Sequence, residues 1–435
     1  DLLGIGISGL KAQQTALSVT GHNITNAGTE GYNRQTVNFN ENTPQFNGGV
    51  WTGNGVNVDS IKRVYDEFLT EQMQRDSSVF NENEVLSVNA SQIDSLLADS
   101  GTGIQPGIER MFGALQSVVD DPSSLPARQV LISEANGLSD RFSTISDRLN
   151  DQSEIINGQM DVIAGEISTI GNAIADLNEQ IQFALAASNG QPPNDMFDQR
   201  DRLITQLSEL VAVEVTAQDG SGMNVFIGNG QSLVIGNESN ELFTQAGDTD
   251  PSRLGLYFRK GDSVLEVTSE IQGGQIGGML QFRETVLEPA INGLGRVALS
   301  INEAFNQQHQ LGIDYEGSKG GNFFDDVNAP SNSYARVHGD GRNKAPNDRL
   351  VSVHITDSAK LTTDNYRLEF PGPGEYVFNV YNDTTGQELK ATALTGELPQ
   401  TVEVDGFEIR LEAGTFQAGD RFLITPTRAA AGNLD

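Results

Sequence analysis

The chain has 435 residues, and its 27 basic and 59 acidic residues give a formal net charge of −32. This length allows about two to four domains, and the negative charge disfavours binding to nucleic acid and to anionic membranes. The sequence contains no cysteine, which excludes disulfides, cysteine zinc sites and thiol catalysis, and none of its apolar runs reaches the roughly 18 residues that a membrane span needs.

A helix is predicted over residues 2–26, and an Asn- and Gly-rich turn overlaps its end at residues 22–35. Apolar residues of the helix recur at four- and three-residue steps, the heptad spacing of a helix that packs along another helix. We expect helix and turn to form an assembly interface between subunits; an ordinary helix end with a glycine turn is the alternative interpretation. The candidate interface residues are Leu3, Ile7, Leu10, Leu17 and Ile24 on the helical seam, and Asn23, Asn26, Gly31, Tyr32 and Arg34 at the turn.

Residues 1–65 are predicted to be a segment of their own, an N-terminal helix followed by an extended linker. They contain four acidic and four basic residues, so the net charge of −32 lies on the rest of the chain. A neutral end can pack against copies of itself while an acidic body faces water. Within the linker, residues 33–64 are expected to be extended and rich in loops, with strand character at Val56 and Val58.

Residues 66–325 are predicted to form a helical bundle. Helical periodicity covers residues 66–99, 106–119, 196–211 and 278–308, together with one long helix whose apolar positions run from Leu131 to Ala184. An extra four-residue step between Ile163 and Ile167 indicates a stutter in its heptad pattern. A β insertion is expected at residues 213–272, with hairpins at 225–235 and 256–265.

Residues 346–428 are predicted to be a separate β-rich outer domain. Strands are expected at residues 350–355, 366–370, 375–381, 401–404, 407–411 and 422–424. Asp405-Gly406 suits a tight type I′ turn between two of them. The predicted fold class is therefore a multidomain α+β protein, in which a long antiparallel, coiled-coil-like helical bundle carries inserted β hairpins and a separate β domain.

The sequence contains only partial matches to motifs for catalysis, nucleotide binding or metal binding. Gly4, Gly6 and Gly9 match the letters of a dinucleotide fingerprint, but no strand precedes them. The four histidines are scattered along the chain, and the acidic turns at 248–250 and 340–341 lack EF-hand spacing, so a metal site is not expected. We predict a protein that is not an enzyme and that has no catalytic residue, metal or cofactor.

Asp198, Arg200 and Asp201 lie on a predicted helix at a spacing that brings opposite charges together. Paired carboxylates can also serve in general acid–base catalysis. The prediction is that these residues form surface ion pairs.

The stretches from Gly21 to Ala27 and from Gly31 to Gln35 resemble the N-terminal motif of the bacterial flagellar rod and hook axial family. Three further stretches, at residues 121–129, 197–210 and 302–324, are similar to the hook-associated members of that family. The resemblance implies a terminal coiled coil along the filament axis, a helical bundle outside it and outer β domains. The resemblance also implies that the chain lacks the family's C-terminal return helix, and from its first residue, which is not Met, and its last residues we expect the chain to be a fragment at both ends.

The resemblance further implies a structural protein that joins hook to filament by assembling into a junction ring. The implied partners are further copies of the chain, the flagellar hook protein, a second junction protein (hook-associated protein 3) and an export chaperone that binds the missing C-terminus. The implied location is extracellular, after export from the cytoplasm without a cleaved signal peptide. A hook or rod axial subunit, or a secreted adhesin acting through its β domain, are the alternative interpretations.

Overall fold

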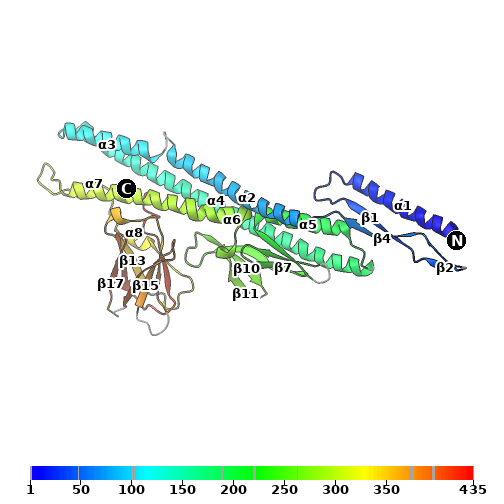
Figure 1. The fold of residues 1–435 in the computed structure, drawn as a ribbon. Helices are drawn as coiled ribbons and strands as arrows, with labels where there is room; N and C mark the ends of the chain where they lie inside the picture. The colour runs from blue at the N-terminus through cyan, green and yellow to red at the C-terminus, as the bar shows by residue number, and fades with distance from the viewer. Residues whose placement is uncertain are drawn as a thin grey trace. The chain divides into compact units, whose positions relative to one another are not determined.

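The computed structural model describes residues 2–47, 49–99, 101, 103–188, 190–218, 222–261, 263–371, 377–393 and 397–434. The chain divides into two compact units, one made of residues 1–85, 160–244 and 256–280 and the other of residues 86–159, 245–255 and 281–435. Both contain helices and antiparallel strands (Figure 1), which confirms the predicted α+β class. The predicted domain boundaries stay predictions.

The helices follow the predicted order with small changes at their ends. They are α1 (Leu2–Thr25), α2 (Glu67–Ala98), α3 (Ile104–Asp120), α4 (Leu125–Ala187), α5 (Asn194–Leu210), α6 (Gly274–Phe282), α7 (Glu288–Gln310) and the short α8 (Pro330–Ala335), with 3₁₀ turns at Thr268–Glu270, Ser358–Lys360 and Ala431–Asn433. A π-helical turn at Arg283–Leu287 joins α6 to α7, so the helix predicted over residues 278–308 is continuous but locally widened.

The long helix α4 has 63 residues, and its predicted apolar seam is largely buried. The position of the stutter differs from the prediction. Gln159 is exposed and Met160 is fully buried, so the extra four-residue step lies between Ile156 and Met160 rather than between Ile163 and Ile167. Burial of the apolar methionine in place of the adjacent glutamine decides this register.

The predicted linker contains two antiparallel hairpins. In the outer one, β1 (Gln35–Glu41) pairs with β4 (Val56–Arg63), and in the inner one, β2 (Gln45–Asn47) pairs with β3 (Val50–Thr52). The linker is therefore more regular than predicted.

The β insertion confirms both predicted hairpins and extends them into two sheets. One sheet has the order β5-β6-β7-β8 and the other the order β11-β10-β9. Their strands are β5 (Val213–Ala217), β6 (Met223–Ile227), β7 (Gln231–Ile235), β8 (Glu238–Ser239), β9 (Glu241–Ala246), β10 (Leu254–Lys260) and β11 (Ser263–Glu266).

The C-terminal β region consists of two sheets, with the orders β12-β19-β14-β15-β16 and β13-β18-β17. Their strands are β12 (Val337–Gly339), β13 (Leu350–Ile355), β14 (Tyr366–Glu369), β15 (Val377–Asn382), β16 (Glu388–Ala393), β17 (Gln400–Val404), β18 (Phe407–Ala413) and β19 (Arg421–Ile424). One apolar core includes side chains from both sheets, with Tyr366, Phe378 and Phe407 almost fully buried. Residues 375 and 376 of the predicted strand 375–381 lie outside the described residues.

Candidate functional site

Helix α1 packs on the outer hairpin through one face. Ala12 and Val19 are buried on this face, and the Ser8 hydroxyl accepts a hydrogen bond from the Val56 backbone N–H at 3.2 Å. Gly55 precedes Val56 with φ of +85°, and a Cβ there would collide with the Ser8 hydroxyl. The close approach of α1 to β4 therefore requires glycine at this position.

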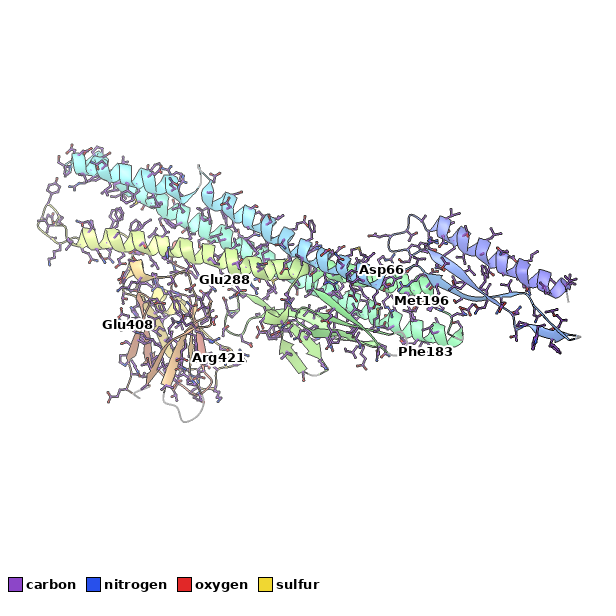
Figure 2. All side chains as sticks on the ribbon, in the orientation of Figure 1. Asp66, Phe183, Met196, Glu288, Glu408 and Arg421 are labelled. Carbon is purple, nitrogen blue, oxygen red and sulfur yellow. The ribbon has the colours of Figure 1, made fainter. Side chains whose placement is uncertain are left out.

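The predicted heptad seam lies on exposed surface of α1. Leu3, Leu10, Leu17 and Ile24 are between 70% and 73% exposed, and Ile7 is 48% exposed. Figure 2 shows side chains projecting from α1 away from β1 and β4. Burying a Leu or Ile side chain contributes about 1.5–3 kcal/mol, so this face would gain considerably from contact with another apolar surface.

Asn23 closes the turn that follows α1. Its side-chain oxygen accepts hydrogen bonds from the Gln35 backbone N–H at 2.8 Å and from the Tyr32 hydroxyl at 2.7 Å. Its side-chain nitrogen donates to the Gln35 carbonyl at 2.9 Å. Two of the candidate interface residues, Asn23 and Tyr32, thus hold the shape of the turn from within.

The other turn candidates differ in environment. Asn26 donates a side-chain hydrogen bond to the His22 carbonyl at 3.0 Å. Gly31 has a φ of +74°, and a Cβ there would lie 3.2 Å from Arg202 Cβ. The Arg34 side chain is exposed, while its carbonyl accepts a hydrogen bond from Val64 at 2.8 Å.

A buried ionic cluster fixes the N-terminal segment to α5, close to the Met196 label in Figure 2. One guanidinium nitrogen of Arg63 donates to Asp198 at 3.0 Å and to Asp201 at 2.5 Å, and all three side chains are at most 12% exposed. The Arg63 guanidinium also lies 4.2 Å from the centroid of the Tyr65 ring. The prediction of surface ion pairs is wrong here, because these carboxylates are buried against the end of β4.

Asp198 also binds Asn33, which lies just before β1 at the other end of the hairpin. The backbone N–H and the side-chain nitrogen of Asn33 donate to its two oxygens at 2.9 and 2.8 Å. Burial raises the pKa of Asp201. The positive charge of Arg63 opposes that shift, because it favours the ionised form of the carboxylate.

Arg200 points to a different partner. Its guanidinium donates to the Asn178 side chain at 2.9 Å, and Asn178 in turn donates to the carbonyls of Met223 and Gly236 at 2.8 and 2.7 Å. Burial lowers the pKa of Arg200. This chain of hydrogen bonds joins α5, α4 and the β5–β8 sheet, which is a structural task rather than a catalytic one.

A groove of about 260 Å³ separates the turn from α5. Its walls include His22, Tyr32, Asp195 and Arg202, and His22 Nε2 lies 3.4 Å from a carboxylate oxygen of Asp195. Burial raises the pKa of the Tyr32 hydroxyl, with the two nearby carboxylates adding to the shift. The groove is polar and open, which suits contact with another chain.

Within the described part of the chain, His, Asp and Glu side chains form no group of three or more that could hold a metal. In that same part, the helices are too short or too polar to cross a membrane.

The structure brings Asn23, Asn26, Gly31 and Tyr32 together around one turn at the end of α1, while the seam residues lie along the exposed face of that helix. Sequence reasoning missed the anchoring residues Asn33 and Arg63, and misplaced their acidic partners. The sequence did contain a sign that Asp201 is buried. It lies three residues before the apolar Ile204, and therefore on the apolar face of α5.

Profiles of known families match most of the chain. The profile described as the helical domain of flagellar hook-associated protein FlgK matches residues 90–324, and that of the D2-like domain of flagellar hook-associated protein 1 matches residues 340–426. A profile of flagella basal body rod proteins matches residues 3–33.

Individual relatives of the chain come from the same flagellar family. Flagellar hook-associated protein 1 of Salmonella typhimurium is 32% identical over 100% of this chain, and that of Escherichia coli K12 is 31% identical; the chain covers 76% and 77% of them. A solved flagellar hook junction protein from Burkholderia pseudomallei matches 84% of this chain with a TM-score of 0.74 and 28% identity. The chain spans 64% of that structure.

Proposed function

Because this chain belongs to the family of flagellar hook-associated protein 1, whose members are structural proteins of the hook-filament junction, we propose that it joins hook to filament by assembling into a ring through its N-terminal segment. It is a structural component of the bacterial flagellum at that junction. We assign it no catalytic reaction.

The observation that carries the ring proposal is the exposed seam of α1 on a helix that is otherwise fixed in place. Leu3, Leu10 and Leu17 face solvent, while the opposite face is tied to the outer hairpin and the hairpin to α5. In the ring, seams of neighbouring copies pack on one another in the manner of a coiled coil. The near-neutral charge of the segment lets the helices approach despite the acidic remainder of the chain.

The turn has a separate part in this proposal. Asn23 and Tyr32 hold its shape, and the exposed Arg34 and the groove beside Gly31 are available to a neighbouring axial subunit. The proposed neighbours are further copies of the chain, the hook protein below the ring and a second junction protein (hook-associated protein 3) above it. From the resemblance alone, we also propose chaperone-assisted export without a cleaved signal peptide to the extracellular flagellum.

The test is binding of the purified chain to isolated hooks, measured by electron microscopy of labelled protein at hook ends. The double variant Leu10→Ser and Leu17→Ser should lose hook-end binding and remain folded by circular dichroism. A matched control, Val264→Ser with Leu265→Ser, changes two exposed apolar residues of β11 and should bind normally. Normal binding of the seam variant would show that another surface drives assembly.

A rod or hook axial subunit is the second candidate, and the rod-protein match over residues 3–33 favours it. That match covers only the N-terminal segment, whereas the hook-associated profiles cover residues 90–324 and 340–426. The adhesin alternative has less support, because the large aromatics Tyr366, Phe378 and Phe407 are core residues of the β domain.

A further inference from the structure

A polar cavity of about 170 Å³ lies between the start of α7 and the loops of the β domain. Its walls combine side chains of α7, of the π-helical turn before it, of two loops of the β domain and of the residue before β10, among them Arg253, Glu284, Glu288, Asn292, Asp364 and Asp383. All of these residues belong to one compact unit, and Figure 2 labels Glu288. The cavity is therefore a feature of that unit alone.

The cavity carries an excess of negative charge. Its charged lining residues are four acidic side chains and one arginine, a net charge of 1 − 4 = −3. Glu288 pairs with Arg253 at 3.0 Å, and Asp383 pairs with Arg367 at 3.3 Å. In the described part of the chain, Glu284 and Asp364 have no such basic partner. A recess lined by charges of one sign attracts ions of the other sign and raises their local concentration.

Asn292 indicates that an occupant must bring a hydrogen-bond donor. It lies on the wall of the cavity and is only 2% exposed. Its side-chain nitrogen donates to the Thr363 carbonyl at 2.9 Å and to the Asn365 side-chain oxygen at 3.1 Å. Since a carbonyl only accepts, the Thr363 contact fixes which end of the amide is the nitrogen. The side-chain oxygen of Asn292 has no hydrogen-bond partner in the described structure, and a buried acceptor of this kind is unfavourable until a donor reaches it.

The cavity suits an ammonium group better than a metal ion or water. Within the residues that the structure describes, no group of acidic or histidine side chains is placed to hold a metal. Water supplies a donor to Asn292 but no positive charge, whereas an ammonium supplies both. The three N–H donors of an ammonium diverge, which matches acceptors that approach from α7 on one side and from the loops of the β domain on the other. A guanidinium, by contrast, prefers a carboxylate in its own plane.

We propose that this cavity binds a primary alkylammonium group. The side-chain oxygen of Asn292 and the carboxylates of Glu288 and Asp364 accept its hydrogen bonds, while the exposed Glu284 and Asp383 attract it electrostatically. A volume of about 170 Å³ also admits the methylene chain that carries such a group. Two sources offer this chemistry, a free short diamine and a lysine side chain of another protein. The inference is independent of the ring function and assigns the chain a binding site beyond it.

Isothermal titration calorimetry on the purified chain at low ionic strength tests this assignment. The probes are butylammonium chloride and tetramethylammonium chloride, whose cations carry the same charge but differ in N–H donors. Butylammonium should bind at one site and at least about tenfold more tightly than tetramethylammonium, because the latter cannot donate to Asn292. The proposal fails if butylammonium shows no saturable binding or if the two cations bind equally well.

Two further titrations separate the sources of the ammonium group. Putrescine represents a free diamine, and Nα-acetyllysine amide represents a lysine side chain. Binding of putrescine that is tighter by about tenfold or more assigns the site to free diamines. Comparable or tighter binding of the lysine derivative assigns it to a lysine side chain of a partner protein. If neither compound binds, the proposal is overturned.

A double variant of the cavity locates the binding. Glu284→Gln with Asp364→Asn keeps the size of both side chains, removes two negative charges and should weaken butylammonium binding by at least about tenfold. The matched control, Asp151→Asn with Glu154→Gln, makes the same change in charge at exposed positions of α4 and should bind like the unchanged chain. Equal affinities of the two double variants would place the binding outside this cavity and contradict the proposal.

Hydrogen exchange on the unchanged chain keeps the test decisive if the cavity variant does not fold. Saturating butylammonium should slow exchange at the backbone amides of Asp364 and Asp383 severalfold, because the loops that carry them gain contacts. Exchange around Asp151 on α4 should stay the same. Slower exchange elsewhere in the chain, with these two loops unchanged, would rule the cavity out as the binding site.

Discussion

Asn33 binds the Asp198 carboxylate twice, through its backbone N–H at 2.9 Å and its side-chain nitrogen at 2.8 Å. The same carboxylate accepts from Arg63, which lies at the far end of the segment. Asp198 therefore holds both strands that lead to and from the N-terminal region. This acidic side chain uses both of its oxygens to hold the region, alongside the contacts of Asp201 with Arg63 and of Asp195 with Gln35.

Removing this carboxylate should loosen the N-terminal segment. Asp198→Ala leaves the guanidinium of Arg63 with Asp201 alone and orphans both donors of Asn33, at an expected cost of about 3 kcal/mol. Hydrogen exchange in β1 and β4 should accelerate by about a hundredfold, measured by mass spectrometry. Glu209→Ala is the control, because Glu209 is on the same helix but exposed to solvent. Equal acceleration in both variants would contradict the assignment of Asp198 as the anchor.

Adding one methyl group at the contact between α1 and β4 should detach the helix. Gly55→Ala places a side chain at a φ of +85° and against Ser8, with an expected cost of about 1–3 kcal/mol. Faster proteolysis of α1 is the readout. Gly53→Ala provides the matched control, since it lies two residues away with open space around it and should leave the cleavage rate unchanged.

The β domain should be sensitive to truncation of its central aromatic pair. Phe407 is fully buried and meets the Tyr366 ring edge-on, with centroids 4.8 Å apart. Phe407→Ala should cost about 3–5 kcal/mol, measured by hydrogen exchange of β14 and β18 across a denaturant series. Leu350→Ala, at a partly exposed edge position of β13, should cost clearly less.

The β domain should also lose stability as pH falls below neutrality. Burial lowers the pKa of His338 and, together with Arg410, that of His354, both from an ordinary value of 6.5. The unfolded chain then binds more protons than the folded one between the lowered pKa values and 6.5, so the free energy of unfolding decreases as pH falls through that window.

Denaturant unfolding between pH 5 and 8 tests this expectation. The double variant His338→Gln with His354→Gln should show a flatter pH profile than the unchanged chain. A profile that is equally steep in both would assign the pH dependence to other groups.

The strands of the β domain were predictable because local signals and burial agree there. Leu350–Ile355 has the bounds expected from its alternating apolar residues, and Asp405 and Gly406 adopt φ values of +40° and +86°, as a type I′ turn requires. The apolar seam of α1 was equally recognisable from the sequence, as a heptad pattern. In both cases the short-range pattern is enough to predict the element, although the pattern does not name its packing partner.

Other features depend on contacts distant in sequence. The burial of Asp198 and Asp201 is decided by Arg63, which lies more than 130 residues earlier. Strand β1 is rich in Asn and Gln, and its regular structure comes from its pairing with β4 rather than from its own propensity. The exposure of Phe46 and Trp51, and that of Leu69, Met73 and Phe80 on α2, could not be recognised from sequence, because exposure is a property of the packed chain.

Asp198 and Asp201 give the N-terminal segment a mechanical property. The antiparallel strands β1 and β4 leave α5 from neighbouring points, since Asn33 and Arg63 share one carboxylate. A pull along the hairpin therefore loads the hydrogen bonds of Asn33 and Arg63 simultaneously, and they must break together rather than one after another. Such parallel loading resists tearing in a way that sequential peeling of a strand could not.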